Sequence, residues 1–332
     1  MREPAFWWRK SGLAARLLAP LGFIYGAVTA RRMARKGATA GVPVLCVGNF
    51  TLGGAGKTPT VIMLARMLAQ TGNRPICLSR GYGGDVEGPK LIDTHSDIAA
   101  HVGDETLLLA NVAPTVVAKN RVAGAAFARA QGADLLIMDD GLQNPSLRKD
   151  FTLAVIDARR GVGNGHTFPA GPLRAPLAAQ LAHSDALLVV GEGTGADHVV
   201  QQARALGRAV FAGRLVPDRS ETDALKGRNV LAFAGIGDPE KFFSTAVAAG
   251  IAVTERRAFD DHHRYTAEEA AELIMQAEHG GLSLLTTEKD HARMKGERLL
   301  EALATRTHIL RVDMAVEETD ELRRLVAAKL GC

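Results

Sequence analysis

A glycine-rich loop that ends in Gly-Lys-Thr carries the strongest chemical signal in this sequence. The loop follows a short apolar run, Val42–Val47, and precedes a helical stretch, Pro59–Thr71. Where such a loop joins a strand to a helix, backbone N–H groups face a polyphosphate, the lysine neutralises its β and γ oxygens, and the threonine hydroxyl ligates Mg²⁺. The sequence therefore predicts a site for a nucleoside triphosphate and Mg²⁺, formed by Gly53, Gly54, Ala55, Gly56, Lys57 and Thr58.

The loop departs from the usual pattern at one position. That pattern places a glycine five residues before Gly56, whereas this chain has Thr51 there. We therefore expect the Gly53-Gly54 pair to supply the tight turn. The alternative is a chance glycine-containing loop that binds no anion, and the flanking strand and helix argue against it.

Two adjacent carboxylates end an apolar run further along the chain. Leu135–Met138 is followed by Asp139 and Asp140, and a magnesium–nucleotide site needs a carboxylate at the end of a buried strand. Neighbouring carboxylates repel each other unless a cation lies beside them, which motivates a metal role. The alternative is an aspartate pair that caps the turn at Gly141. Gln143, in the same turn, is a candidate for orienting a reacting group or a water molecule.

Two further clusters are candidates for proton transfer. Gly103-Asp104-Glu105 precedes the helical stretch Thr106–Ala110, where a carboxylate is commonly an N-cap. In the functional interpretation, Asp104 accepts the proton of an attacking hydroxyl. Asp260-Asp261-His262-His263 has three interpretations: metal binding, an exposed cluster, or support of a base. A zinc site is disfavoured because no cysteine lies nearby.

The elements that must position these side chains follow an alternating pattern. From residue 42 onward, short β-branched runs alternate with helical stretches, which predicts an α/β fold with a mostly parallel sheet flanked by helices, like that of P-loop NTPases. The expected strands are Val42–Val47, Arg74–Leu78, Thr115–Ala118, Leu135–Met138, Leu153–Ile156, Ala186–Val190, Val210–Leu215, Val230–Ala234, Leu282–Thr286 and Ile309–Val312. The expected helices include Pro59–Thr71, Val122–Gln131, Lys241–Ala249, Ala267–Glu278 and Thr319–Leu330.

A polar stretch separates two α/β blocks. Residues 217–228 are rich in Asp, Arg, Ser and Thr, and a second block restarts at Asn229. We therefore predict a basic and apolar N-terminal helix over 1–36, a P-loop core over 37–216, and a smaller α/β lobe over 217–332. Residues from both lobes are expected to meet, because a cleft between lobes is where a ligand is enclosed and water is excluded.

Composition and charge exclude several classes of protein. The 332 residues, of which 47% are apolar and 23% charged, suit a soluble globular protein and exclude disorder and collagen-like order. Three scattered cysteines, Cys46, Cys77 and Cys332, exclude a disulfide framework and favour a reducing, cytoplasmic setting. Eight Lys and Arg against one Glu give residues 1–36 a net charge of +7, which leaves −3 for the rest of a chain whose total is +4. No nucleic-acid partner is expected from that distribution.

The N-terminal positive charge flanks one apolar segment. Leu17–Val28 lies between Arg16 and Arg31 and contains Pro20. We predict that this segment is too short to span a membrane, because a spanning helix needs about 20 mostly apolar residues. We interpret it as an interfacial anchor whose apolar side chains enter the headgroup boundary while flanking Lys and Arg bind anionic lipid. The alternatives are a cleaved signal peptide and a buried first helix.

Taken together, these motifs resemble one family, the tetraacyldisaccharide 4′-kinases of lipid A biosynthesis. The matching stretches are collinear over nearly the whole chain: Gly48-Asn49, Gly53-Gly54-Ala55-Gly56-Lys57-Thr58-Pro59, Ser79-Arg80-Gly81-Tyr82-Gly83-Gly84, Gly103-Asp104-Glu105, Asp139-Asp140-Gly141-Leu142-Gln143, Gly163-Asn164-Gly165, Pro169-Ala170-Gly171-Pro172-Leu173-Arg174, Asp261-His262-His263 and Thr287-Glu288-Lys289-Asp290. The basic, apolar N-terminus also resembles the membrane-associating helix of that family.

The resemblance implies a kinase that transfers the γ-phosphoryl group of ATP to the 4′-hydroxyl of an acylated glucosamine disaccharide 1-phosphate, giving lipid IVA. It implies that Asp104 is the catalytic base and that His262 is coupled to it across the interlobe cleft. It further implies that ATP and Mg²⁺ are held by Lys57, Thr58 and Asp139, with Asp140, Glu105 and Gln143 as supporting polar residues, Glu105 near the metal and Gln143 near the nucleotide. Arg80, Tyr82, Arg174 and Lys289 lie in family motifs without an assigned ligand.

The resemblance also implies a location and partners. It implies a peripheral, monotopic enzyme on the cytoplasmic face of the inner membrane of a Gram-negative bacterium, which binds the acylated disaccharide and anionic lipid and has no obligate protein partner. On the residues alone, two other classes stay open. One is a P-loop phosphotransferase with a soluble acceptor, and the other is a membrane-bound nucleotide switch that hydrolyses nucleotide and transmits a conformational change.

Overall fold

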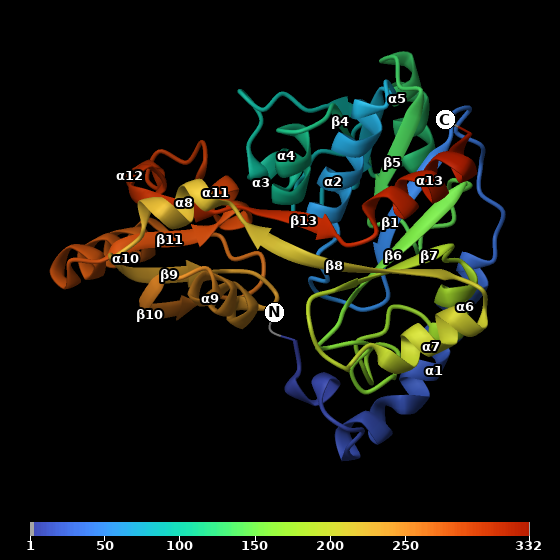
Figure 1. The fold of residues 1–332 in the computed structure, drawn as a ribbon, viewed down its shortest axis with the longest axis horizontal. Coiled ribbons are helices and arrows are strands. Elements are labelled where there is room, and N and C mark those ends of the chain that lie inside the picture. Colours follow the sequence, from blue (N-terminus) through green and yellow to red (C-terminus); the bar gives the residue numbers. More distant parts are fainter. Residues whose placement is uncertain (1–2, 332) are drawn as a thin grey trace.

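A nine-stranded sheet forms the centre of the larger lobe in the computed structural model, which describes residues 3–331. Its strands are β1 Val44–Asn49, β2 Pro75–Ser79, β3 Lys90–Leu91, β4 Thr115–Val117, β5 Leu135–Asp139, β6 Phe151–Asp157, β7 Ala186–Val190, β8 Ala209–Pro217 and β13 Val312–Val316. They run in the order β13-β8-β7-β6-β1-β5-β2-β4-β3 (Figure 1). The strands from β8 to β4 are parallel, and only β13 and β3, at the two edges, are antiparallel to their neighbours.

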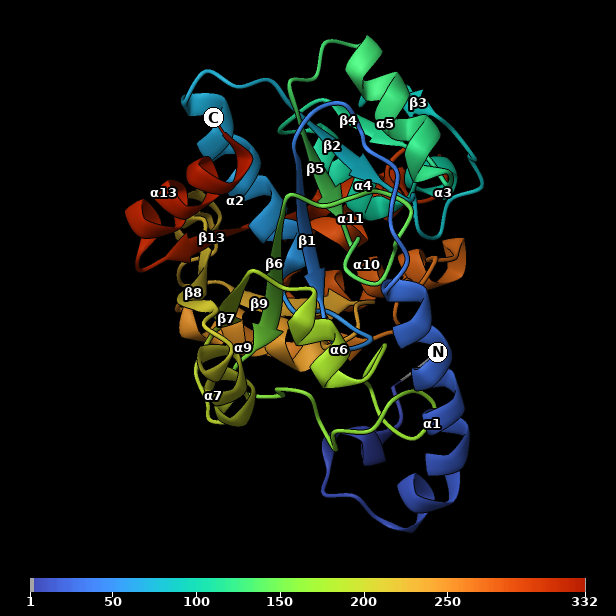
Figure 2. The same cartoon turned by 90° about the vertical axis from the view of Figure 1, so that its right-hand side faces the viewer.

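Helices cover both faces of this sheet, which explains why its central strands are apolar along their whole length. Every residue of β1, β5 and β6 is buried. One face packs against α2 Lys57–Gln70 and α13 Thr319–Leu330. The other face packs against α5 Arg121–Ala130, α6 Leu177–Ala182 and α7 Asp197–Ala205. The short helices α3 Ala99–Val102 and α4 Asp104–Ala110 lie near β4 (Figure 2).

The smaller lobe is built on a four-stranded parallel sheet with the order β10-β9-β11-β12. Its elements are β9 Asn229–Ala234, β10 Ala252–Ala258, β11 Ser283–Thr287, β12 Thr307–Leu310, α8 Arg219–Ala224, α9 Pro239–Ala248, α10 Ala267–Gly280, α11 Glu288–Met294 and α12 Glu301–Arg306. Phe243 of α9 packs on one face of the sheet and Leu273 of α10 on the other. The predicted α/β class, with a mostly parallel sheet and a smaller second lobe, is confirmed.

The end of the chain returns to the larger lobe. The sequence predicts residues 217–332 as one smaller unit, whereas β13 pairs with β8 and α13 buries Leu322 and Val326 against the large sheet. The predicted strand Ile309–Val312 joined the end of β12 to the start of β13, which are separate strands on either side of Arg311. The chain therefore crosses between the lobes twice. As folding units, the three predicted segments stay a prediction.

The other expected elements overlap observed ones, with bounds that shift by a few residues. β10, which the sequence analysis did not include, is an edge strand whose residues alternate between exposed and half-buried. Because β10 contains the charged residues Glu255, Arg256 and Arg257, it does not have the β-branched pattern by which the other strands are predicted. The predicted helices over 59–71, 122–131, 241–249, 267–278 and 319–330 correspond to α2, α5, α9, α10 and α13.

The N-terminal segment forms a 3₁₀ turn, Ala5–Trp8, and then α1, Leu13–Met33, which is continuous although Pro20 lies inside it. By length and composition alone, α1 could cross a membrane. The prediction that this segment is too short is therefore wrong as to length. Arg16 and Arg31, the charged residues on either side of the apolar run, both lie inside the helix, so the helix is longer than that run.

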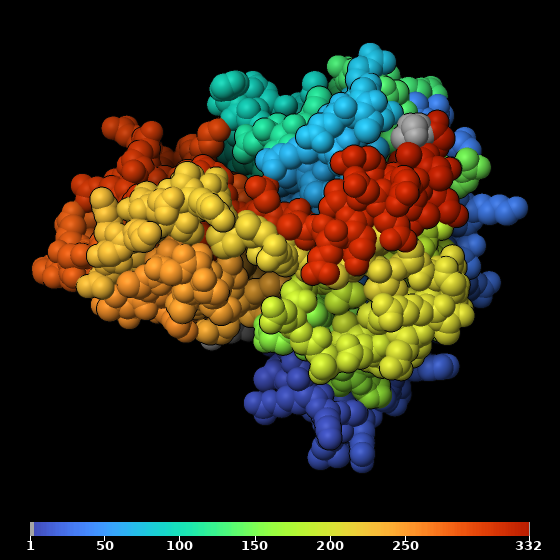
Figure 3. Space-filling view, in the orientation of Figure 1, coloured from blue at the N-terminus to red at the C-terminus, as the bar shows by residue number. Residues whose placement is uncertain are grey.

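One face of α1 packs against the larger lobe through glycine. A Cβ on Gly22 would lie 2.7 Å from the Thr167 carbonyl oxygen, so glycine permits a contact that no other residue would. The Thr167 hydroxyl donates to the Gly22 carbonyl at 2.5 Å. The opposite side of α1 is exposed and apolar, and the N-terminal segment protrudes from the larger lobe at the bottom of Figure 3. Its exposed large side chains are Leu13, Leu17, Leu21, Phe23, Ile24, Tyr25 and Val28. The alternative of a buried first helix is thereby excluded.

Candidate active site

The predicted phosphate loop lies between β1 and α2, and glycine supplies its two left-handed turns. Gly53 has φ +93° and Gly56 has φ +95°, a region in which side chains are strained. Gly56 is the N-cap of α2, so Lys57 and Thr58 form the first helical turn. The N–H groups of that turn have no partner within the helix and can bind an anion in front of the loop.

The Lys57 ammonium is buried within the loop, with 8% of the residue exposed. It donates to Asn49 Oδ1 at 3.2 Å and lies 3.7 Å from Asp140 Oδ1. The Asn49 amide in turn donates to the carbonyls of Thr51 and Gly53. Asn49 therefore fixes both the loop backbone and its lysine, which keeps the cation in place before any nucleotide arrives.

Asp139 ends β5 beside the phosphate loop, because Val47 of β1 is its partner in the parallel register. Its residue is 2% exposed, and its Oδ1 atom is buried with no hydrogen-bond partner. Burial, together with the negative charges of Glu105 and Asp140, raises the pKa of Asp139 to about 7. A buried carboxylate oxygen without a partner needs a cation, so this residue fits a divalent metal.

The protein supplies few ligands to such a metal. Within residues 3–331 there is no group of three or more His, Cys, Asp or Glu that could hold an ion. Mg²⁺ is commonly held by one or two protein groups, with waters and substrate phosphates completing its octahedron. The Thr58 hydroxyl and Asp139, at the start of α2 and the end of β5, are therefore a suitable pair of donors for Mg²⁺ but not for zinc.

Asp140 has a different environment from its neighbour. Its two oxygens accept hydrogen bonds from Arg174 Nη1 at 2.9 and 2.8 Å. Although burial alone would raise it, the pKa of Asp140 is held well below its usual range by Arg174 and Lys57. Arg174 also donates through Nε to the Thr51 carbonyl at 2.8 Å. The arginine of the Pro169–Arg174 motif therefore supports the phosphate loop from the protein side.

Gln143 supports the same loop from behind. Its amide nitrogen donates to the Asn49 carbonyl at 2.8 Å and to Gln180 Oε1 at 2.7 Å. Both N–H groups of that amide are thereby occupied by protein. The residue lies close to the nucleotide loop, as the sequence predicts, but in this structure its donors hold the end of β1 rather than face a substrate.

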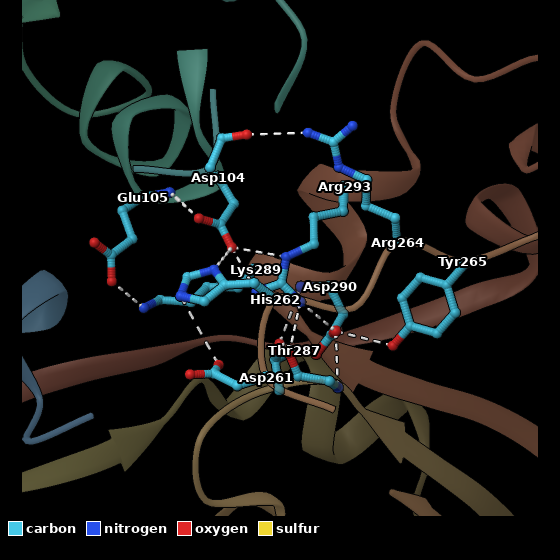
Figure 4. A network of polar contacts seen from close by, with 12 residues as sticks. Asp104, Glu105, Asp261, His262, Arg264, Tyr265, Thr287, Lys289, Asp290 and Arg293 are labelled. Atoms are coloured by element: carbon cyan, nitrogen blue, oxygen red, sulfur yellow. Dashed lines mark hydrogen bonds and ion pairs between the residues drawn. The ribbon is translucent and has the colours of Figure 1, made fainter. Parts of the chain in front are cut away.

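Asp104 lies at the first position of α4, and only 3% of it is exposed. Its Oδ1 accepts from the Glu105 N–H at 2.8 Å, while its Oδ2 accepts from Arg293 Nε at 2.7 Å and Nη2 at 2.5 Å. His262 Nδ1 lies 3.5 Å from the same Oδ2 (Figure 4). Burial would raise the pKa of Asp104, but His262, Arg293 and Lys289 together hold it well below its usual range.

His262 comes from the smaller lobe and meets Asp104 across the interlobe cleft. Its backbone has φ +56°, and its ring lies 4.9 Å from that of Tyr82. His263 serves the smaller lobe instead, since it bonds to Glu269 at 2.8 Å and stacks on Phe259. Of the three interpretations of this cluster, the structure favours support of a base by His262.

Two cations of α11 reach the acidic pair of α4. Lys289 pairs with Glu105, and Arg293 pairs with Asp104. The sequence analysis included Lys289 only as a motif residue and missed Arg293. Lys289 and Arg293 are spaced i and i+4 and so share one face of a helix, but nothing in the sequence indicates that this face meets α4.

Glu3 also reaches the phosphate loop, which the sequence analysis did not predict. Its Oε2 accepts from Trp8 Nε1 and Arg160 Nη1, each at 2.9 Å. A Cβ on Gly53 would lie 2.1 Å from Glu3 Oε1. Burial raises the pKa of Glu3, against the opposing effects of Arg160 and Trp8. The segment that precedes α1 therefore lies against the loop at the mouth of the site.

A cavity of about 280 Å³ opens beside Asp104 and His262. Tyr82 and Arg264 give it polar groups, whereas Ala99 and Leu300 give it apolar walls. The arrangement thus joins a glycine loop at a helix N-terminus, a buried carboxylate that fits a divalent metal, and a second buried carboxylate with a histidine beside it. Those are the groups needed to hold a polyphosphate and to accept a proton from a hydroxyl.

Loss of charge at Asp139 and at Asp140 should change the melting temperature in opposite directions. We expect Asp139→Asn to raise the melting temperature of the metal-free protein at pH 8 by about 2–6 °C, because it removes a buried charge without a partner that costs about 1–2 kcal/mol. The sign follows from its raised pKa: the destabilisation by the ionised carboxylate grows as the pH rises above the ordinary aspartate pKa and is complete above about pH 7. Asp140→Asn is the matched control and should lower the melting temperature, because it breaks the pairs with Arg174 and Lys57. Thermal denaturation in EDTA measures both, and a shift of the same sign would contradict the prediction.

The chain is similar to known proteins over nearly its whole length. The family model described as Tetraacyldisaccharide-1-P 4′-kinase matches residues 14–331. The chain is 54% identical over 331 residues to a tetraacyldisaccharide 4′-kinase of Rhodopseudomonas palustris (strain BisB5), covering 100% of this chain and 97% of that protein. It is 52% identical to the protein of the same name from Nitrobacter hamburgensis, covering 100% of this chain and 99% of that protein.

A solved structure has the same fold. The crystal structure of "apo" form LpxK from Aquifex aeolicus in complex with ATP superposes with a TM-score of 0.71 at 25% sequence identity. The match covers 96% of this chain and 100% of that one. The similarity therefore includes both lobes and the connections between them.

Proposed function

The chain belongs to the tetraacyldisaccharide-1-P 4′-kinase family, and on that premise we propose a role for each residue of its site. It is an ATP-dependent kinase of lipid A biosynthesis that acts on a hydroxyl group: it transfers the γ-phosphoryl group of ATP to the 4′-hydroxyl of tetraacyldisaccharide 1-phosphate. The observation that carries our assignment of roles is the meeting, at one end of the large sheet, of the phosphate loop, the unpartnered oxygen of Asp139 and the Asp104–His262 pair.

We propose that the phosphate loop and Lys57 bind the triphosphate. The first-turn N–H groups of α2 donate hydrogen bonds to the phosphate oxygens, and the Lys57 ammonium lies against the β and γ oxygens. Because Lys57 is already held by Asn49 and Asp140, little reorganisation is needed when charge develops on the γ-phosphoryl group. Backbone contacts are assigned to Gly53, Gly54, Ala55, Gly56 and Thr58, and Gln143 is assigned to support of the loop.

Thr58 and Asp139 would hold Mg²⁺, with Glu105 near it. When bound there, Mg²⁺ would supply positive charge that neutralises the phosphate oxygens. The protein contribution to this site is the placement of two donors on rigid elements, the end of β5 and the start of α2. Asp140 is assigned no metal contact, since Arg174 occupies both its oxygens.

Asp104 is the proposed base. A sugar hydroxyl is a weak nucleophile, so a carboxylate within hydrogen-bond reach assists by taking its proton as the bond to phosphorus forms. His262 Nδ1, at 3.5 Å from Asp104 Oδ2, supports the carboxylate from the smaller lobe. The cavity beside this pair gives the acceptor hydroxyl an approach.

We propose that α1 seats the enzyme on the cytoplasmic face of the inner membrane as a peripheral anchor. An acylated substrate leaves a bilayer reluctantly, because each buried CH₂ contributes about 0.8 kcal/mol. The exposed apolar side of α1, with Arg31 and Arg32 in its last turn, suits the headgroup boundary of an anionic membrane. The glycine contact that fixes α1 to Thr167 would hold the cleft at a constant position relative to the lipid surface.

Transfer of labelled phosphate tests the proposed function. The enzyme is incubated with [γ-³²P]ATP, Mg²⁺ and the tetraacyldisaccharide 1-phosphate, and the lipid is separated by thin-layer chromatography. Label is expected on the lipid, and its appearance should require Mg²⁺. Label released only as inorganic phosphate would favour a nucleotide switch, and label on a water-soluble sugar but not on the lipid would favour a soluble acceptor.

The anchor is tested on the exposed side of α1. Leu17→Glu with Ile24→Glu should weaken binding to vesicles of phosphatidylethanolamine and phosphatidylglycerol about tenfold or more, because each buried apolar side chain contributes about 1.5–3 kcal/mol. Leu206→Glu, at an exposed position at the C-terminal end of α7, is the matched control, because α7 and α1 lie on opposite sides of the view in Figure 2. Co-sedimentation measures the binding, which should also weaken with salt. Equal binding of both variants would contradict the anchor.

A further inference from the structure

Arg293 links the two lobes at the proposed base. It lies on α11 of the smaller lobe and is only 6% exposed as a side chain. Two of its nitrogens, Nε and Nη2, donate to Asp104 Oδ2 at 2.7 and 2.5 Å. The third, Nη1, donates to the Gly235 carbonyl at 2.7 Å and to Asp290 Oδ1 at 3.0 Å. All three guanidinium nitrogens are therefore engaged, which removes the freedom that a long side chain normally keeps.

The smaller lobe holds Arg293 through Asp290, which is fully buried. Asp290 Oδ1 also accepts from the Gly235 N–H and from the Tyr265 hydroxyl, each at 2.9 Å. Its Oδ2 accepts from the Thr287 hydroxyl at 2.6 Å. With its partner fixed by three groups of the smaller lobe, the guanidinium is a rigid donor aimed at the larger lobe (Figure 4).

We propose that Arg293 is a positioning residue for phosphoryl transfer: from the smaller lobe, it fixes the carboxylate of Asp104 in the orientation that receives the proton of the acceptor hydroxyl. The inference rests on the proposed role of Asp104 as base. Without Arg293, the hydrogen-bond and ion-pair partners of that carboxylate within residues 3–331 would be the neighbouring Glu105 N–H and the more distant His262. Arg293 holds Oδ2 while the Glu105 N–H holds Oδ1, so both oxygens are fixed and the rotation of the carboxylate is defined, which the single local bond alone does not achieve.

The pairing of α11 with α4 makes this orientation specific. Lys289, one turn before Arg293 on the same helix, takes the neighbouring carboxylate, Glu105. Each carboxylate of α4 thus accepts hydrogen bonds from its own cation, Glu105 from Lys289 and Asp104 from Arg293. Since both cations belong to the smaller lobe, Asp104 has its full set of partners only while the lobes are together. The position of the smaller lobe therefore determines whether the Asp104 carboxylate of the larger lobe is held in its orientation.

Arg293→Gln tests the inference. We expect kcat for lipid phosphorylation to fall about 10–100-fold, because a displaced catalytic group costs that much, while KM for ATP stays unchanged because the nucleotide loop is untouched. Lys295→Gln is the matched control. Lys295 follows α11 and donates to the Thr94 carbonyl of the larger lobe at 2.5 Å, so its loss removes an interlobe contact without touching Asp104. It should keep kcat within about twofold of the original.

A double-mutant cycle separates positioning from general stability. In the Asp104→Asn background, Arg293→Gln should lower the residual kcat less than threefold, because the group it positions no longer acts as a base. An equal fractional loss in both backgrounds, or an unchanged kcat in Arg293→Gln alone, would overturn the inference. If Asp104→Asn itself keeps full activity, the proposed base is refuted; if it is inactive and Arg293→Gln is fully active, only the positioning role is refuted.

Because Asp290, the partner of Arg293, is buried, a second variant is needed. Removing Arg293 alone leaves the Asp290 charge buried without its cation, which is strongly destabilising. If Arg293→Gln unfolds at the assay temperature, the same cycle is measured with Asp290→Asn as the reference and Asp290→Asn, Arg293→Gln as the variant. That pair of changes removes both charges together. The expected coupling to Asp104→Asn is the same, and its absence would overturn the inference.

Discussion

Lys57→Met should lower kcat for lipid phosphorylation by about 10²–10³-fold or more. The ammonium is the one side-chain cation that the phosphate loop itself contributes, and Asn49 and Asp140 hold it in place. A methionine of similar length fills the same space but cannot neutralise the charge that develops on the transferred phosphoryl group. The loss should lie mainly in kcat, because the ground-state triphosphate keeps its backbone N–H contacts.

The fold should survive this change, which makes the measurement interpretable. Asp140 keeps both hydrogen bonds from Arg174 when Lys57 is lost, so its buried carboxylate is not left without a cation. Lys119→Met, at a surface lysine that lies 3.5 Å from Glu87, is the matched control and should keep full activity. Thermal denaturation and initial rates with [γ-³²P]ATP measure the two effects. A folded Lys57→Met enzyme with near-normal kcat would refute the role of the loop.

The nucleotide half of the site is predictable from local sequence. Strand, glycine loop and helix are contiguous between Val42 and Thr71, so a short stretch of chain determines where Lys57 lies. The parallel pairing of β1 with β5 then brings Asp139 alongside, because the carboxyl ends of neighbouring parallel strands share one edge of a sheet. An apolar run ending in aspartate is enough to indicate that position.

The proton-transfer half is not predictable from local patterns. Asp104 and His262 meet only because the smaller lobe folds back onto α4, and no spacing in the sequence encodes that contact. The family resemblance implied that Asp104 and His262 are coupled. In the structure, His262 Nδ1 lies 3.5 Å from Asp104 Oδ2. Arg293, which donates to the same carboxylate, lies in a short helix near the end of the chain where no motif marks it. Its partner becomes evident only in the tertiary structure.

The two lobes contribute opposite charges to their contact. The larger lobe brings Asp104 and Glu105 at the start of α4, and the smaller lobe brings Lys289 and Arg293 on α11 together with His262. At a second contact the charges alternate: Arg159 of the larger lobe donates to Asp238 of the smaller lobe at 2.5 Å, and Lys241 of the smaller lobe donates to Asp157 of the larger lobe at 2.6 Å. Complementary charge at both contacts favours one relative orientation of the two lobes and disfavours others.

Asp104→Asn should lower kcat by about 10²–10⁴-fold, the range expected when a general base is lost. The amide has the shape of the carboxylate and still presents one oxygen to Arg293, so the local structure is retained, but it cannot take a proton at neutral pH. KM for ATP should stay near its original value, because Asp104 lies on α4 and not in the phosphate loop.

Coupling between Asp104 and His262 is the sharper test of the same step. If the histidine acts through the carboxylate that it faces at 3.5 Å, then His262→Ala should cost much less in the Asp104→Asn enzyme than in the original, and the two losses should combine less than multiplicatively. His263→Ala is the matched control, since that ring bonds to Glu269 and stacks on Phe259 within the smaller lobe; its effect should be the same in both backgrounds. Fully multiplicative losses for Asp104 and His262 would show that the two side chains serve separate steps, and the proposed pairing across the cleft would fail.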